Sequence, residues 1–142
     1  MAKQEAIYTS GGGPVAGAPP YTPAVRAGNL LFVSGQLGLD PDTRQPHADF
    51  EKQVEGAIAG VRALVEAAGG TLEDVVKTTV FLADIGNFAR LNEIYGRHFA
   101  GPVRPARSTF QVAALPLGAD VEIEAIAVLE TADGSVGRPD AF

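Results

Sequence analysis

The segment from Val121 to Leu129 carries apolar side chains on both sides of one extended strand, and this pattern limits the possible folds more than any other. Successive side chains of a strand point to opposite faces of the sheet. One side would present Val121, Ile123, Ala125, Ala127 and Leu129, and the other Ile126 and Val128. A sheet that contains this strand therefore needs a cover on both faces.

Turn residues and hydrophobic spacing divide the rest of the chain into alternating strands and helices. Gly28-Asn29 predicts the turn of a hairpin, and Gly69-Gly70 ends an amphipathic helix that starts near Asp49. The expected elements are a hairpin at 24–35, helices at 49–68 and 87–99, and strands at 75–82, 108–113 and 121–129.

The resulting order, β-β-α-β-α-β-β, predicts an α+β two-layer sandwich with a mixed, mostly antiparallel sheet and two helices on one face. Two helices leave the other face bare, so association of sheets between subunits is the simplest cover. A chain of 142 residues predicts a single domain over 1–142. Segment 1–18, rich in Gly and Pro, is expected to be flexible, and segment 131–142 to be an irregular tail.

Composition removes several kinds of chemistry. The chain has no cysteine and only two histidines, which argues against thiol catalysis, disulfides and a metal centre. A net charge of −6 argues against nucleic acid as a partner. With no long apolar run and no secretory signal, we expect a cytoplasmic protein without a membrane segment.

Few side chains remain that could perform chemistry. Arg107 follows a proline break at the start of a strand and could clamp a carboxylate, although this segment alone favours a solvent-exposed arginine on an edge strand. Glu122 and Glu124 share one face with apolar neighbours, where a carboxylate is either paired or functional. Tyr21 and Ser34 place hydroxyls where the chain bends, which is also ordinary turn chemistry.

Several ordered segments resemble the Rid family (reactive intermediate deaminase, also called YjgF or L-PSP), and its RidA branch in particular. The resemblance covers about residues 19–130. It is carried by PYTPAV at 20–25, AGNLLFVSGQ at 27–36, VVKTTVFL at 75–82, NEIY at 92–95, PARST at 105–109 and VEIEAIA at 121–127.

The resemblance implies a chorismate-mutase-like sandwich whose sheets pack into a barrel in a homotrimer, with clefts between subunits. It also implies a hydrolase acting on C–N bonds, a 2-iminobutanoate/2-iminopropanoate deaminase that converts small 2-imino or 2-enamino acids into 2-oxo acids and ammonia. No cofactor and no metal would be needed.

The resemblance also implies roles for single residues. Arg107 corresponds to the arginine that binds the substrate carboxylate, and Glu122, rather than Glu124, to the acid that positions water. The remaining matched positions would bind substrate or support the cleft; they are Tyr21, Ser34, Gly35, Asn92 and Thr109, of which Tyr21 and Ser34 would come from the neighbouring subunit. Thr109 stands where the family often has cysteine.

Other functions stay open at this point. A dedicated catabolic deaminase of the same fold would act on an aminomuconate- or aminoacrylate-type substrate. A non-catalytic ligand-binding or chaperone-like module would also need a carboxylate clamp. A ribonuclease-type translation inhibitor is disfavoured by the acidic charge.

Overall fold

A computed structural model describes residues 3–9 and 12–130, so the predicted tail at 131–142 lies outside the described residues. The strands are β1 (Glu5–Ile7), β2 (Ala24–Ala27), β3 (Leu30–Gln36), β4 (Val75–Leu82), β5 (Ala106–Gln111) and β6 (Val121–Val128). The α-helices are α1 (Phe50–Ala67) and α2 (Phe88–His98), and short 3₁₀ turns occupy Leu72–Asp74, Ile85–Asn87 and Pro116–Gly118.

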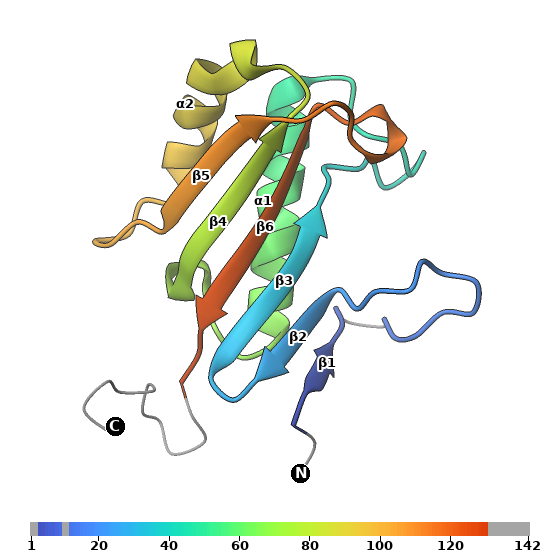
Figure 1. Cartoon of the computed structure of the whole chain (residues 1–142), viewed down its shortest axis with the longest axis vertical. Coiled ribbons are helices and arrows are strands. Elements are labelled where there is room, and N and C mark those ends of the chain that lie inside the picture. The colour runs from blue at the N-terminus through green and yellow to red at the C-terminus, as the bar shows by residue number, and fades with distance from the viewer. Residues whose placement is uncertain (1–2, 10–11, 131–142) are drawn as a thin grey trace.

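All six strands belong to one mixed sheet, in the order β1-β2-β3-β6-β4-β5. Neighbouring strands are antiparallel except for β4 and β5, which run parallel. Both α-helices lie behind the sheet in the view of Figure 1, and α1 packs along β6 and β3. The predicted α+β fold, with two helices on one face of a mostly antiparallel sheet, is confirmed.

Helix α1 has a capping residue at its start, a glycine after its end and an apolar face that packs on the sheet. The carboxylate of Asp49 accepts a hydrogen bond from the Lys52 backbone N–H and so caps the first turn. After the last turn, Gly69 takes a positive φ of 93°, which residues with a side chain rarely adopt. Between these ends a buried stripe that includes Val54, Ile58 and Val61 faces the sheet.

The two sides of β6 differ as its sequence predicts. Val121, Ile123, Ala125 and Ala127 are buried under the helices. Ile126 and Val128 are half-buried on the opposite side, which we call the open face, and Ile126 pairs there with Phe32 of β3, still 44% exposed. No element within 3–9 or 12–130 covers this face, so the described part of the chain leaves its apolar side chains without a cover.

Two strands depart from the sequence prediction. Strand β1 lies inside the segment that was expected to be flexible, where it pairs with β2 and buries Ile7 to 7% exposure. Three residues are too few to show a strand period in the sequence. Strand β5 covers Ala106–Gln111 rather than 108–113, because its parallel pairing with β4 begins directly after Pro105.

Candidate functional site

The guanidinium of Arg107 is held by helix α2. Its Nη2 donates a hydrogen bond of 2.5 Å to Oδ1 of Asn92. The same group lies 4.8 Å from the ring centroid of Tyr95 and 5.6 Å from that of Phe88, which are cation–π distances. Arg107 is thus fixed in one direction by three side chains of one helix, and no residue within 3–9 or 12–130 occupies its other N–H groups.

A buried hydrogen bond fixes Tyr95 in turn. The Tyr95 hydroxyl and Oγ1 of Thr78 are 2.7 Å apart, and Thr78 is 0% exposed. Burial raises the pKa of Tyr95, against smaller opposing effects of the Thr78 hydrogen bond and the Arg107 charge, so the hydroxyl stays protonated at neutral pH. Sequence analysis missed Tyr95 and Thr78, because an aromatic residue on a helix and a β-branched residue in a strand both indicate core.

The pocket beside this arginine is small and cationic. It has a volume of about 260 Å³ and is lined by Asn92, Tyr95, Gly96, Arg104, Pro105 and Arg107. Two arginines and no acidic side chain face it. Thr109 follows Arg107 on the same side of β5, and its Oγ1 is buried without a hydrogen-bond partner in the described part of the chain.

Glu122 lies elsewhere, on the open face. It pairs across strands with Phe81, which pairs with Phe110 and contacts its ring edge to face at 5.2 Å. Burial, and then the like charge of Glu124, raise the pKa of Glu122. Glu124 shares this face but is exposed, so Glu122 has the more protected position of the two carboxylates.

Glycine at position 35 makes room for that carboxylate. A Cβ on Gly35 would lie 2.5 Å from Oε2 and 2.7 Å from Cδ of Glu122, distances that real Cβ atoms do not show. The two residues expected from the resemblance, Gly35 and Glu122, are therefore in direct contact. Glu122 lies against the backbone of β3 only because residue 35 has no side chain.

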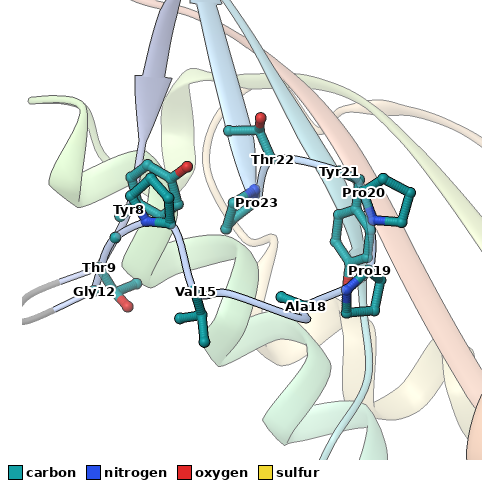
Figure 2. Close-up of a pocket in the computed structure, with 12 residues that line it drawn as sticks. Tyr8, Thr9, Gly12, Val15, Ala18, Pro19, Pro20, Tyr21, Thr22 and Pro23 are labelled. Carbon is teal, nitrogen blue, oxygen red and sulfur yellow. The ribbon is translucent and has the colours of Figure 1, made fainter.

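Ser34 and Tyr21 have unequal surroundings. The Ser34 hydroxyl donates to the Thr22 carbonyl at 2.7 Å, which ties β3 to the chain that precedes β2. Tyr21 is 66% exposed. Figure 2 shows it beside Pro19 and Pro20, at one side of a cavity of about 560 Å³, with Tyr8 and Val15 at the other side. None of the twelve residues that line this larger cavity is charged, so it offers no ion-pair partner for a carboxylate.

Arg107 and Glu122 occupy opposite faces of the sheet. Arg107 pairs with Thr78, whose side chain is buried on the helix side, whereas Glu122 belongs to the open face together with Phe81 and Phe110. Residues paired across neighbouring strands share a face. One chain therefore does not bring its own Arg107 and Glu122 together, and a site that uses both needs a second copy.

The described residues contain neither a group of side chains suited to a metal ion nor a helix suited to span a membrane. Within 3–9 and 12–130 no three His, Cys, Asp or Glu side chains are grouped so that they could hold a metal ion. Neither helix in this part of the chain combines the length and apolarity that crossing a bilayer requires.

The fold and the arginine held by α2 define a small α+β protein with a pocket at one edge of its sheet that two arginines line. Residues 13–129 match the family model described as Endoribonuclease L-PSP. The chain belongs to this family, which is also the Rid or YjgF family.

Individual relatives agree with this family. Over 111 residues the chain is 48% identical to Reactive Intermediate Deaminase A, chloroplastic, from Arabidopsis thaliana, with coverage of 78% of this chain and 59% of that protein, less than two thirds. It is 47% identical to the 2-iminobutanoate/2-iminopropanoate deaminase of Mus musculus, covering 77% and 81% of the two chains. The crystal structure of E. coli TdcF with bound serine superposes with a TM-score of 0.79 at 38% identity, covering 87% and 98%.

Proposed function

We propose that this protein is an imine deaminase that hydrolyses small 2-imino acids, such as 2-iminobutanoate and 2-iminopropanoate, to 2-oxo acids and ammonia. The observation that carries the proposal is the Arg107 guanidinium, oriented by Asn92 and Tyr95 toward a pocket without acidic residues. Relatives named as deaminases support the reaction, and a relative crystallised with serine supports an amino-acid-sized ligand.

Arg107 binds the substrate carboxylate in this proposal. A guanidinium can bind a carboxylate through two parallel N–H···O bonds, which fixes the plane of the adjacent C=N bond. Because Asn92 and Tyr95 already hold the side chain, less conformational entropy is lost when substrate binds. Thr109, with its unpartnered hydroxyl two residues further along β5, supplies a hydrogen bond to the bound ligand.

Glu122 handles the protons. Water adds to the imine carbon to form a C–O bond, and the C–N bond then breaks as a proton reaches the leaving nitrogen, so that one imine and one water give one 2-oxo acid and one ammonia. A carboxyl with a raised pKa can both accept the proton of water and return it to nitrogen. Gly35 lets Glu122 take its position. Ser34, the preceding residue of β3, and the exposed Tyr21 keep their proposed roles in substrate binding.

The active site is completed by assembly. Since Arg107 and Glu122 of one chain face opposite ways, the proposed site pairs Arg107 of one subunit with Glu122 of another in a homotrimer. The open face supports this assembly, because Phe32 and Phe110 are 44% and 45% exposed there beside the half-buried Ile126. A cytoplasmic location stays a prediction, since one relative is named as chloroplastic.

The direct test follows the loss of imine. An amino-acid oxidase generates 2-iminopropanoate, semicarbazide traps what remains, and wild type is compared with Arg107→Ala and Glu122→Gln. We expect wild type to shorten the imine lifetime and both variants to lose most of this effect. Arg90→Ala is the matched control, since Arg90 pairs with Glu51 outside the pocket. A wild-type protein without effect on the imine would refute the proposal and favour a module that only binds small ligands.

Mixed assemblies test the shared site. If Arg107→Ala and Glu122→Gln chains are unfolded together and refolded as random mixtures, about one quarter of the sites in a closed ring contain both native residues, so up to about that share of wild-type activity returns. Each variant refolded alone stays inactive. If the mixtures regain no activity although light scattering shows the mass of the assembled protein, Arg107 and Glu122 do not act in one shared site.

A further inference from the structure

A second arginine shares the pocket of Arg107. Arg104 lies in the loop between α2 and β5 and lines the same cavity of about 260 Å³. Its Nε donates a hydrogen bond of 3.1 Å to the carbonyl of Phe99, the residue that follows α2. Within the described part of the chain Arg104 has no other hydrogen bond and no ion pair, so its two terminal nitrogens are available to a ligand.

Charge is unbalanced at this pocket and balanced elsewhere on the same helix. Arg90 and Arg97 of α2 both pair with Glu51, at 3.5 and 3.3 Å. The chain has 17 acidic and only 11 basic residues, so carboxylates are plentiful. Nevertheless Arg104 and Arg107 line a pocket with no acidic side chain. Two like charges at one small cavity favour an anion between them.

We propose that Arg104 forms a second carboxylate subsite beside Arg107, and that the preferred substrates are 2-imino dicarboxylates of four or five carbons. This inference rests on the proposed deaminase function and specifies its substrate class. Arg107 takes the carboxylate next to the imine, and Arg104 takes the carboxylate at the far end of the carbon chain. The cavity is slightly smaller than the usual range of about 300–1,000 Å³ for ligand pockets, which suits a short diacid.

The neighbouring residues leave space for this second group. Gly96 lines the same pocket as Arg104, and a Cβ placed there would meet no atom within 4 Å, so the space beside Gly96 is open. The Nε hydrogen bond to Phe99 limits the motion of Arg104 while its fork of N–H groups stays unpaired. A lysine at this position would keep the charge but lose both the anchor and the two parallel hydrogen bonds.

The test compares two imines on the same variants. D-Aspartate oxidase produces 2-iminosuccinate or 2-iminoglutarate, D-amino-acid oxidase produces 2-iminopropanoate, and semicarbazide measures the loss of each. Hydrogen bonds to a charged group predict that Arg104→Gln lowers the ratio of kcat/KM for the diacid over the monoacid about ten- to a hundredfold. Arg104→Lys should lower it by less. Arg90→Gln removes the same charge outside the pocket and should leave the ratio unchanged.

Two outcomes overturn the inference: an Arg104→Gln variant with an unchanged ratio, or a ratio that Arg90→Gln lowers equally. A wild type that hydrolyses neither imine would refute the deaminase function instead. In that case calorimetry with 2-oxo acids, the products of the reaction, tests whether the second carboxylate subsite exists. Oxaloacetate or 2-oxoglutarate should bind wild type more tightly than pyruvate, and Arg104→Gln should remove the difference. Equal affinities for wild type would refute the subsite.

Discussion

Tyr95 has two separate contacts, and substitution can remove one without the other. Its hydroxyl bonds Oγ1 of the buried Thr78, and its ring lies under the Arg107 guanidinium. Tyr95→Phe deletes only the hydroxyl. Because Thr78 is 0% exposed, its Oγ1 then loses its partner without gaining water, which costs about 1–3 kcal/mol of unfolding free energy. The ring under Arg107 is retained.

Urea unfolding at one fixed protein concentration measures this cost. Thr78→Val should destabilise by a similar amount, whereas the double variant should cost less than the sum, because no polar atom is then left unpaired. Equal effects of the double variant and the summed single variants would refute the buried hydrogen bond as the cause.

The kinetics of imine hydrolysis test the contact between the Tyr95 ring and Arg107 independently of the hydroxyl. Tyr95→Leu removes the cation–π contact with Arg107, worth about 1 kcal/mol at a half-buried site, and should raise KM about fivefold. Tyr95→Phe keeps an aromatic ring and should change KM much less. If the two variants raise KM equally, the ring does not orient Arg107.

Three further predictions concern other parts of the molecule. Gly35→Ala should lower kcat for imine hydrolysis sharply with little change in circular dichroism, because the new Cβ would displace the Glu122 carboxylate; unchanged kcat would contradict its placement. Burial raises the folded-state pKa of Glu122, so its ionisation costs stability as pH rises from the ordinary carboxyl pKa through the raised one. Glu122→Gln should therefore have a higher urea midpoint than wild type above that range but not below it, and parallel pH profiles would argue against the raised pKa. Asp49→Ala should lower the free energy of unfolding, measured in urea, by about 1 kcal/mol because it removes the cap of α1. Asp49→Ser can still cap the helix and should retain most of that stability.

Much of the fold could be predicted because its main elements have strong periods and clear ends. Helix α1 has a capping Asp49 and a terminal Gly69, and β6 alternates so regularly that both of its faces could be assigned. The sequence could not predict that Arg107 and Glu122 lie on opposite faces of the sheet. Their placement depends on the register of β5 against β4, a parallel pairing that tertiary packing sets. The sequence did not point to Arg104 as a site residue, since a surface arginine in a loop is ordinary.

The two faces of the sheet carry the two proposed roles of the site, proton transfer on one face and ligand binding on the other. In the proposed mechanism the carboxylate of Glu122 transfers protons and must be partly protected from water, and the open face provides this protection when a second chain covers it. Arg107, the proposed carboxylate clamp, lies at the other face, beside the loop that carries Arg104. Changes in that loop can alter which ligand is bound without disturbing either Glu122 or the apolar side chains of the open face. Substrate choice and proton transfer are therefore expected to respond to different substitutions, the first to residue 104 and the second to residue 35.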